Sequence, residues 1–340
     1  MATSTARHSN RGITRRRLLR AAGRVTATGL AAPLIGRFSA ALAAYPDRPI
    51  KFIVPFGPGG PVDVVARVIA EPVAEQLGAT VYIENRPGAS GNLGIGVAAR
   101  SDPDGYSVLI IASSLVINPM LFAKVPYDVE KDFLPLVDLA DTPTGFACGL
   151  SLGVKTLGEF IALAKGNTRL SYSHPGFGTV SHLTAEYFKN ISGVEMAAVP
   201  HSGSGPAAQS ALSGAVEFCS AGLPAVQPYI SAGTLAGLGV TSARRWFDLP
   251  HVPTLVESGF PDFVLGNFTA MLVPAKTPPE IAERLTTATL AALQKPELRT
   301  KLRTAGLEAT AGGPDALTAR IAREIPLWRK ISGIAGVRPA

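Results

Sequence analysis

Short apolar runs alternate with amphipathic stretches along most of this chain. Residues 50–56 form a short apolar run that ends at a Gly-Pro-Gly-Gly turn, which is typical of a buried parallel strand. Residues 62–77 carry apolar side chains at helical spacing and stop at Gly78. The alternation then continues with a strand, a helix and a strand, over residues 80–84, 93–100 and 107–112. This order predicts a parallel sheet with right-handed crossovers.

The same alternation extends to the end of the chain. Further helices are expected over residues 157–165, 180–190, 205–212, 226–231, 279–293 and 316–331. Further strands are expected over residues 170–173, 196–200, 216–220, 235–241 and 263–273. The last two helices have clear starts, because proline and acidic residues stand in their first turns.

The number of strands bears on the fold class. Ten strands in one sheet would be unusual for a chain of this size, so the pattern favours an α/β fold with two lobes. Each lobe would be a mostly parallel sheet flanked by helices. Long, turn-poor segments over residues 133–150 and 235–243 predict two crossings between the lobes, which would form a hinge. The first lobe would consist of residues 44–140 plus 243–340, and the second of residues 141–242.

The first 43 residues differ from the rest of the chain. They hold eight arginines and no acidic residue, and they lead through a weakly apolar stretch to Ala41-Leu42-Ala43. A basic head, an apolar middle and small residues at the end are the layout of a secretory signal peptide. Adjacent arginines, with Arg24 inside the apolar stretch, favour the twin-arginine export route of bacteria. The alternative is a basic arm that binds nucleic acid, in which the Ala-x-Ala step would have no role.

Removing this segment changes the net charge. The whole chain has 32 basic and 25 acidic residues, which give a net charge of +7. Without the eight arginines it has 24 basic and 25 acidic residues, which give a net charge of −1. The basic pI of the whole chain therefore comes from the predicted signal peptide, and nucleic acid is not an expected partner. No later stretch is long and apolar enough for a membrane-spanning helix, so the exported protein is expected to be soluble in the periplasm. Cys148 and Cys219 both stand in apolar, strand-like runs, and their spacing leaves a disulfide and two buried thiols equally open.

Polar, glycine-rich loops follow four of the predicted strands, over residues 56–63, 112–118, 173–182 and 200–205. In open α/β sheets, ligands lie beyond the carboxyl ends of the strands, where loops meet helix N-termini. Glycines let the backbone approach a ligand closely, and free N–H groups at helix starts favour an anion. The sequence therefore predicts a cleft of N–H and O–H donors that binds an anion reversibly.

Other chemistry has less support in these loops. A phosphate-binding loop would end in Gly-Lys-Ser/Thr, but Pro61 stands at the position of the lysine. His174 and His182 are eight residues apart, which is not a spacing of zinc ligands, so neither a metal nor a cofactor is expected. Ser204 could pair with His201 or His182 as a nucleophile, but no third group is identifiable. No catalytic residue is expected, and an exported hydrolase or lyase is kept as an alternative.

The motifs of the chain resemble those of the receptor proteins of tripartite tricarboxylate transporters, also called Bug proteins. The similarity begins with Tyr45-Pro46-Asp47-Arg48-Pro49-Ile50 and Val54-Pro55-Phe56-Gly57-Pro58-Gly59-Gly60 with Asp63. It continues with VYIENRPGASG over residues 81–91, Asn92, Gly94, Asp102-Pro103-Asp104-Gly105-Tyr106, Pro126-Tyr127-Asp128, Lys131-Asp132-Phe133, Ser181-His182-Leu183, and the prolines of residues 249–254 and 274–279. The motifs cover the whole chain after the signal peptide, and their combined order is highly specific.

The resemblance implies a two-lobed periplasmic binding protein of the Venus flytrap type, in which a ligand carboxylate lies between a loop of each lobe. The residues carried over are Phe56, Gly57, Gly60 and Asp63 on one side and Gly176, Phe177, Gly178, Thr179 and Ser181 on the other, with Ser113, Asn118, His201, Ser202 and Gly203 lining the remainder. Two departures alter the polarity of the pocket wall. Pro200-His201-Ser202-Gly203-Ser204 replaces the usual Pro-Tyr-Lys-Gly-Gly, and Ser220-Ala221-Gly222 stands where the family often has Phe-Asp-Asn.

The resemblance also implies a function. The protein is expected to capture a small carboxylate by lobe closure and to deliver it, as a monomer, to the membrane permease subunits of a tripartite transporter. A sensor that feeds a signalling partner would have the same fold and is the main alternative. The sequence does not identify the solute.

Overall fold

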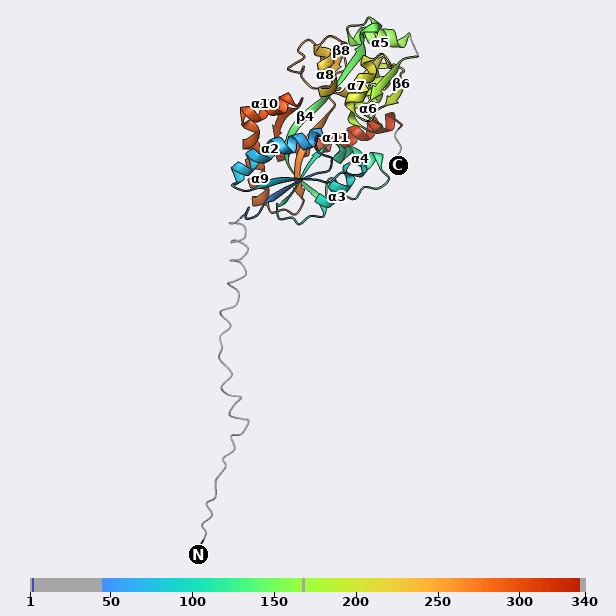
Figure 1. Ribbon diagram of the computed structural model, residues 1–340. Coiled ribbons are helices and arrows are strands. Elements are labelled where there is room, and N and C mark those ends of the chain that lie inside the picture. Colours follow the sequence, from blue (N-terminus) through green and yellow to red (C-terminus); the bar gives the residue numbers. More distant parts are fainter. Residues whose placement is uncertain (1, 3–44, 167–168, 337–340) are drawn as a thin grey trace. The chain divides into compact units, whose positions relative to one another are not determined.

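The computed structural model describes residues 2, 45–166 and 169–336 of the chain. Beyond Tyr45 the chain forms one compact unit, whose ribbon is shown in Figure 1. The predicted signal peptide, residues 1–43, lies outside the described residues apart from Ala2.

Strands and helices alternate, as the hydrophobic pattern predicts. The strands are β1 (Ile50–Val54), β2 (Val81–Asn85), β3 (Ser107–Ala112), β4 (Phe133–Gly149), β5 (Ser171–His174), β6 (Ala197–Pro200), β7 (Phe218–Gly222), β8 (Leu235–Val240), β9 (Gly266–Pro274) and β10 (Glu308–Gly312). The α-helices are α2 (Pro61–Leu77), α3 (Asn92–Ala99), α4 (Ser114–Leu121), α5 (Leu157–Lys165), α6 (Val180–Ser192), α7 (Ser204–Leu212), α8 (Leu223–Ser231), α9 (Pro279–Gln294), α10 (Pro296–Thr304) and α11 (Pro314–Ile334). Two short 3-10 helices are η2 (Ala89–Gly91) and η3 (Leu150–Leu152).

The long strand β4 joins two halves of one sheet. The strand order is β2-β1-β3-β9-β4-β7-β5-β6, and β8 and β10 also pair with β4. Residues 133–143 of β4 pair with β9, and residues 144–149 pair with β7 and β8. The expectation that these strands would not share a sheet is wrong, because β4 is long enough to belong to both halves.

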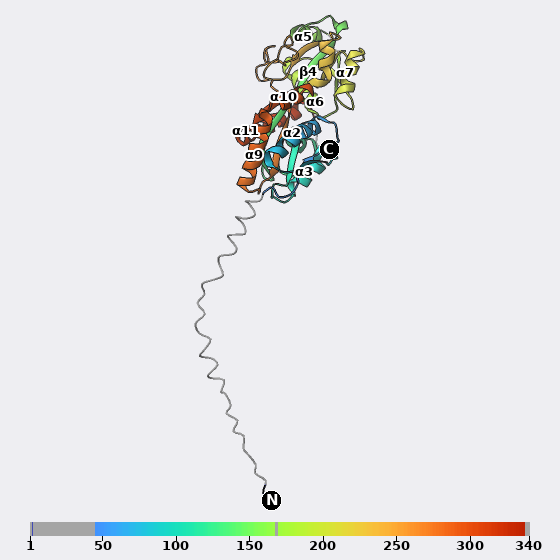
Figure 2. The ribbon, with the colours of Figure 1, turned by 60° about the vertical axis from the view of Figure 1, so that its left-hand side comes forward.

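Each half has a parallel part and an antiparallel part. In one half β1 is parallel to β2 and β3, and in the other β5 is parallel to β6 and β7. The pairs made by β4 and β9 are antiparallel. Figures 1 and 2 show α5 and α7 beside one half and α2, α3 and α9 beside the other, with β4 running between them, and Figure 1 also shows α8 beside the first of these halves. Helices cover both faces of parallel strands, as expected for crossover connections.

The chain passes between the two halves a second time beside β4. The N–H of Thr241 donates to the carbonyl of Thr144 at 3.1 Å, and the N–H of Thr144 donates to Oγ1 of Thr241 at 2.9 Å. The N–H of Leu265, just before β9, donates to the carbonyl of Thr241 at 3.1 Å. The start and the end of the loop over residues 242–264 are therefore held together at Thr144.

This loop packs differently from the sequence-based assignment. Trp246, Leu249 and Val252 are buried in one cluster with Val226 of α8 and Ala147 of β4. The sequence places the boundary at residue 243 and gives this loop to the first lobe. Trp246, Leu249 and Val252 pack against the β7–β8 half, whereas Leu255 and Phe263 belong to a cluster that also contains Ile53 and Leu109. The loop has no long helix or strand of its own, so no periodicity in the sequence reveals which half it covers.

Besides the two 3-10 helices, two α-helices and one strand have no counterpart in the predicted pattern. Four consecutive residues of α4, Leu115 to Asn118, are buried, so this helix lacks the polar face that marks an amphipathic helix. Only Leu298 and Leu302 are buried in α10, which is otherwise polar. The short strand β10 carries half-buried residues and pairs with β4 across an irregularity in register.

The two cysteines lie on opposite faces of the sheet. Cys219 pairs with Ala147, and both belong to the cluster that contains Trp246. Cys148 is the next residue of β4, so its side chain points to the other face, where it joins a cluster with Phe146. Both thiols are free and buried, and burial raises the pKa of each to about 12. In the described part of the chain, no helix has the length and apolarity to cross a membrane.

Candidate functional site

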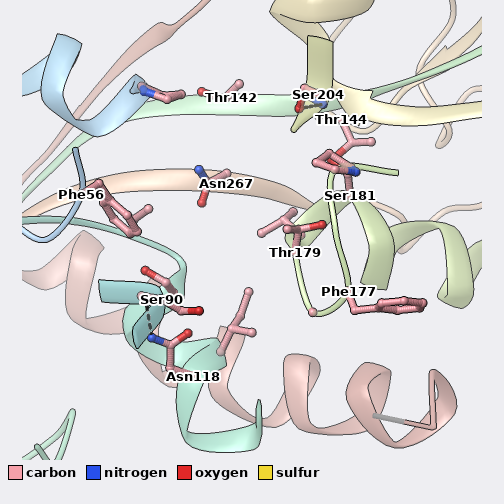
Figure 3. A pocket seen from close by; sticks show the side chains of 18 of the residues that line it. Phe56, Ser90, Asn118, Thr142, Thr144, Phe177, Thr179, Ser181, Ser204 and Asn267 are labelled. Atoms are coloured by element: carbon pink, nitrogen blue, oxygen red, sulfur yellow. Dashed lines mark hydrogen bonds between the residues drawn. The ribbon is translucent and has the colours of Figure 1, made fainter. Parts of the chain in front are cut away.

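A cavity of about 380 Å³ lies beside the part of β4 where its pairing partners change from β9 to β7 and β8. Thr142, Pro143 and Thr144 of β4 line it, together with Asn267 of β9. Figure 3 shows Thr142, Thr144, Ser181 and Ser204 on one side, Ser90 and Asn118 on the other, and Phe56 and Asn267 between them. The complete lining is Phe56, Pro61, Ser90, Ala112, Ser114, Ile117, Asn118, Leu121, Thr142, Pro143, Thr144, Pro175, Phe177, Gly178, Thr179, Val180, Ser181, Ser204, Gly222 and Asn267.

Five helices begin at this cavity. The lining includes the first residues of α2, α4, α6 and α7 and the residue that precedes α8, which are Pro61, Ser114, Val180, Ser204 and Gly222. The first N–H groups of a helix have no acceptor within the helix, and together they carry a partial positive charge. Proline lacks an N–H, so α2, α7 and α8, which have Pro61, Pro206 and Pro224 in their first turns, each offer one donor fewer than α4 and α6. Helix starts arranged in this way favour an anionic ligand.

The side chains of the lining are uncharged among the described residues. The polar ones are hydroxyls and amides, and three of the hydroxyls belong to Thr142, Thr144 and Ser181. Thr144 and Ser181 are at most 6 % exposed, and their hydroxyl oxygens are 3.2 Å apart. The hydroxyl of Ser220 donates to the carbonyl of Ser181 at 2.7 Å, which fixes the start of α6 against β7. The site therefore presents fixed dipoles rather than ionised side chains.

Two donors at the start of α4 and β9 are not fully used within the protein. The hydroxyl oxygen of Ser114 is buried and has no hydrogen-bond partner in the described structure. The side-chain oxygen of Asn267 accepts from the N–H of Ser113 at 3.2 Å. This bond orients the amide of Asn267, which lines the cavity. A buried polar group without a partner is costly, so the hydroxyl of Ser114 is suited to a ligand or to ordered water.

Two stacked histidines support the loop between β5 and α6. Nδ1 of His174 accepts from the N–H of Gly176 at 3.2 Å, and Nδ1 of His182 accepts from the N–H of Gly178 at 3.2 Å. The two imidazoles have centroids 4.4 Å apart, and the ring of Phe177 lies edge-on to both. Burial is the main cause that lowers the pKa of both histidines, to about 4 for His182. The neutral histidines therefore hold the loop, and the amides of Gly176 and Gly178 are not free to bind a ligand.

The predicted residues of the loop after β1 divide into two groups. Phe56 lines the cavity, whereas Gly57, Gly60 and Asp63 do not. The buried carboxylate of Asp63 accepts from the N–H of Gly59 at 2.8 Å and from the side chains of Arg67 and Asn85. Burial raises the pKa of Asp63, but these hydrogen bonds outweigh burial and leave the pKa below its ordinary value. Asp63 closes the turn instead of contacting the cavity.

Ser113 and Asn118 have structural hydrogen bonds. The hydroxyl of Ser113 accepts from the N–H of Phe268 at 3.0 Å, and Ser113 is outside the lining. Asn118 lines the cavity, but its NH₂ group donates to the carbonyl of Ser90 at 2.9 Å and to the side chain of Asn92 at 2.8 Å. Asn118 therefore shapes the wall and has no N–H left for a ligand.

The β5–α6 loop contributes most of the predicted residues that do line the cavity: Phe177, Gly178, Thr179 and Ser181. The hydroxyl of Thr179 accepts from the N–H of His182 and donates to the carbonyl of Gly176, so it caps α6. In Figure 3 the ring of Phe177 points away from the other labelled side chains, and this residue is 68 % exposed. Gly176 is not part of the lining.

The predicted loop after β6 lies elsewhere. His201, Ser202 and Gly203 do not line the cavity, and His201 lines a separate hollow beside α7. Ser204 does line the cavity, and its hydroxyl accepts from the N–H of Gly222 at 3.2 Å. No histidine in the described ranges makes a hydrogen bond to Ser204. Nor do residues 45–166 and 169–336 contain a group of three or more His, Cys, Asp or Glu placed to hold a metal ion.

Sequence reasoning missed the residues contributed by the sheet. Thr142, Thr144 and Asn267 stand within long strands, and no turn signal marks them. The one local signal is that Thr142 and Thr144 flank Pro143 within a strand that is mostly apolar apart from Asp138 and Asp141.

The chain is similar to known proteins over most of its length. A sequence model described as the tripartite tricarboxylate transporter family receptor matches residues 65–334. Protein BugT of Bordetella pertussis is 34% identical over 326 residues, which cover 95% of this chain and 98% of that protein. A protein from the tcbD-tcbE intergenic region of Pseudomonas is 31% identical over 292 residues, covering 85% of this chain and 87% of the relative.

Solved structures show the same architecture. An R. palustris protein solved with adipate is 34% identical with a TM-score of 0.74, and the match covers 87% of this chain and 100% of that one. The periplasmic binding protein BugD is 31% identical with a TM-score of 0.72, over 87% of this chain and 100% of that one. MatC from Rhodopseudomonas palustris, solved with malate, is 30% identical with a TM-score of 0.69, and the match covers 84% of this chain and 99% of MatC. These likenesses confirm the predicted fold class, an α/β periplasmic binding protein.

Proposed function

The chain belongs to the receptor family of tripartite tricarboxylate transporters, and from this premise we propose that it binds a small carboxylate in the cavity beside β4. The observation that carries the proposal is the convergence of five helix starts on a cavity whose described lining has no charged side chain. Dipoles and hydroxyls stabilise a carboxylate through charge-assisted hydrogen bonds, and the absence of a fixed cation favours release.

The ligand would bridge two lobes that meet at β4. We place the change of lobe between Pro143 and Thr144, because the pairing partners of β4 change there from β9 to β7 and β8. The second crossing would lie at Thr241 and Leu265, which are hydrogen-bonded to each other beside Thr144. A ligand that contacts both sides of the cavity would stabilise the closed arrangement over an open one.

A contact across the cavity supports this closure. The side chain of Leu121, at the end of α4, lies against Gly178 of the β5–α6 loop, so closely that a methyl group on Gly178 would be 2.7 Å from Cδ1 of Leu121. α4 follows β3 in one half of the sheet, and the loop follows β5 in the other. The contact would therefore form on closing and break on opening.

Partners and location follow from the family. The solved relatives are periplasmic binding proteins, and we propose that this chain reaches the periplasm through its twin-arginine-type signal, residues 1–43. There it would deliver its ligand, as a monomer, to the membrane permease subunits of a tripartite transporter. The relatives are solute-binding receptors rather than enzymes, and Ser204 has no histidine bonded to it in the described structure.

The proposal is tested by a thermal-shift screen of carboxylates followed by calorimetric titration of the hits. A ligand at 100 times its dissociation constant adds about 2.7 kcal/mol of stability, so binding carboxylates will raise Tm clearly. Ser181→Ala removes a buried hydroxyl of the cavity and is expected to weaken binding by about tenfold, the usual effect of losing one hydrogen bond to a charged group.

Ser213→Ala is the matched control. Ser213 is exposed at the end of α7, outside the cavity lining, so this variant should bind like the unmodified protein. The proposal fails if no carboxylate raises Tm, or if Ser181→Ala and Ser213→Ala bind a carboxylate hit equally well.

A further inference from the structure

We infer that the preferred ligand carries one carboxylate on an apolar body, which lies along α4 with its carboxylate at the first turn of that helix. This inference rests on the proposed function, since it names the class of carboxylate that the same cavity would select. It differs from the chemistry in the family's name and from the ligands of the two relatives solved with adipate and malate, all of which carry more than one carboxylate.

One face of α4 runs along the cavity. Ser114, Ile117, Asn118 and Leu121 all line it, at the i, i+3, i+4 and i+7 positions that share a helix face. This face changes character from its first residue to its last. It begins with a hydroxyl at the positive end of the helix and ends with leucine.

The donors gather at the first turn of α4. The hydroxyl of Ser114 is buried there without a partner, and Asn267 is placed beside it through the hydrogen bond to Ser113. Thr142 pairs with Asn267 across β4 and β9, is 8 % exposed, and its hydroxyl makes no hydrogen bond within the described chain. The starts of α7 and α8 belong to the same lining. A carboxylate at this position would satisfy groups that the fold leaves unsatisfied.

The side chains of the last turn of α4 offer no comparable donor. Ile117 and Leu121 are apolar, and both N–H bonds of Asn118 are used by Ser90 and Asn92. Leu121 contacts Gly178, whose N–H is bound to His182. Burying a second carboxylate against these groups would remove its water without replacing the lost hydrogen bonds, which is strongly unfavourable.

The test compares two linear six-carbon ligands that differ in the number of carboxylates, hexanoate and adipate, by calorimetric titration of the purified protein at neutral pH. Hexanoate is expected to bind at least about tenfold more tightly than adipate. Citrate is the third ligand and is expected to bind more weakly than hexanoate. Hexanamide, which has the same body without the charge, should also bind more weakly than hexanoate, because its head group cannot form charge-assisted hydrogen bonds.

A charge placed at the apolar end should reverse this preference. Leu121→Lys adds a cation next to the position of the second carboxylate, so the ratio of adipate to hexanoate affinity should rise by about tenfold or more. Leu150→Lys adds the same charge at an exposed leucine outside the cavity and should leave the ratio unchanged.

Each outcome separates this inference from the proposed function. Hexanoate preferred by the unmodified protein, with the ratio shifted by Leu121→Lys alone, supports it. Adipate or citrate bound as well as or better than hexanoate overturns the single-carboxylate inference but leaves the carboxylate receptor intact. A ratio that Leu121→Lys and Leu150→Lys leave unchanged overturns the placement of the body along α4. Binding of neither hexanoate, adipate nor citrate overturns the inference and counts against the proposed function as well.

Discussion

At the scale of single residues, the loop between β5 and α6 depends on groups that do not touch a ligand. His174 and His182 accept the N–H groups of Gly176 and Gly178, and the hydroxyl of Thr179 caps the helix that follows. Their combined effect is to fix the backbone at the start of α6, where the N–H groups that face the cavity are found.

Gly178 is the residue of this loop for which substitution should matter most. Its φ of +75° is unfavourable for other residues, and an added Cβ would meet Leu121. Gly178→Ala should lower the free energy of unfolding by about 1–3 kcal/mol and weaken ligand binding, as measured by urea denaturation and titration. Gly158→Ala, in the first turn of α5 with open space around it, should instead be neutral or stabilising by about 0.5–1 kcal/mol. Equal effects of the two alanines would contradict the role given to Gly178.

The histidine pair predicts an acid-sensitive fold. Burial, followed by the neighbouring His174, lowers the pKa of His182 from an ordinary 6.5 to about 4. The unfolded chain therefore takes up a proton at this residue as the pH falls below 6.5, while the folded chain resists doing so until about pH 4. Stability should be full above pH 6.5 and fall between these two values, by up to about 1.4 kcal/mol per pH unit for one histidine.

Thermal melts from pH 4 to pH 7 measure this slope. His182→Gln keeps a polar side chain of similar size but cannot titrate, so its Tm should change less with pH in this range. His251→Gln serves as the control because His251 is exposed, and its pH dependence should match that of the unmodified protein. Identical pH profiles for all three proteins would show that buried His182 does not set the slope.

Residue types alone predicted part of the site. The glycine and hydroxyl loop over residues 173–182 was predictable, because a strand, small polar residues and a helix follow one another in the sequence. Thr142, Thr144 and Asn267 were not, because a strand residue becomes part of a site only when a distant strand pairs beside it. The partners of Gly176, Gly178 and Asp63 were equally hidden, since glycine and aspartate motifs look the same whether they bind a ligand or brace a turn.

At the scale of elements, α11 is fastened to the region where the sheet changes halves. Arg320 of α11 forms ion pairs with Asp138 and Asp141 of β4 at 2.8 and 2.7 Å and with Glu324 at 2.9 Å. Its guanidinium also lies 4.8 Å from the ring centroid of Phe268 in β9. Burial raises the pKa of Asp141 to about 6, even though Arg320 opposes this. One arginine thus compensates three carboxylates beside the proposed hinge.

Removing this arginine should be costly. Arg320→Met would leave buried carboxylates without their cation, and the expected loss is about 3–5 kcal/mol of unfolding free energy by denaturant titration. Arg323→Met, an exposed position on the same helix, should change stability by no more than about 0.5 kcal/mol. If Arg320→Met does not fold, Arg320→Lys should still show a loss larger than that of Arg323→Met. Comparable losses of unfolding free energy for the substitutions of Arg320 and Arg323 would contradict the proposal that Arg320 compensates the carboxylates.

The elements themselves were largely predictable, because hydrophobic periodicity reflects burial on one face. The bounds predicted from periodicity match the observed ones for β3 and α5, and they differ by a few residues for most other elements. Periodicity failed for α4, which is buried over four consecutive residues, and for α10, where only two residues are buried. Periodicity also says nothing about which strands pair. The pairing of β4 with strands of both halves of the sheet could therefore be seen only in the structure.

At the scale of the whole molecule, the proposed function requires two arrangements of the same lobes. Under the proposed function, the close approach of Leu121 to Gly178 would belong to the closed arrangement. Without a ligand, the population should shift towards an open form in which this contact is lost.

Small-angle X-ray scattering tests this motion. Addition of a saturating carboxylate ligand should reduce the radius of gyration of the protein, because the hinge strands let the lobes close without unfolding. A carboxamide analogue that does not bind at the same concentration should leave the scattering unchanged. A radius of gyration that stays constant when the carboxylate binds would argue for a rigid cavity.

The pairing of β3 with β9 also has a consequence for how the protein is made. Leu109 pairs with Leu272, so one edge of β3 cannot find its partner until the ribosome has added more than 150 further residues. At the usual rates of synthesis this takes on the order of ten seconds, during which an apolar strand with unused backbone groups is exposed. A nascent chain in this state is prone to aggregate, so a chaperone that shields β3 until synthesis is complete should increase the yield of the folded receptor.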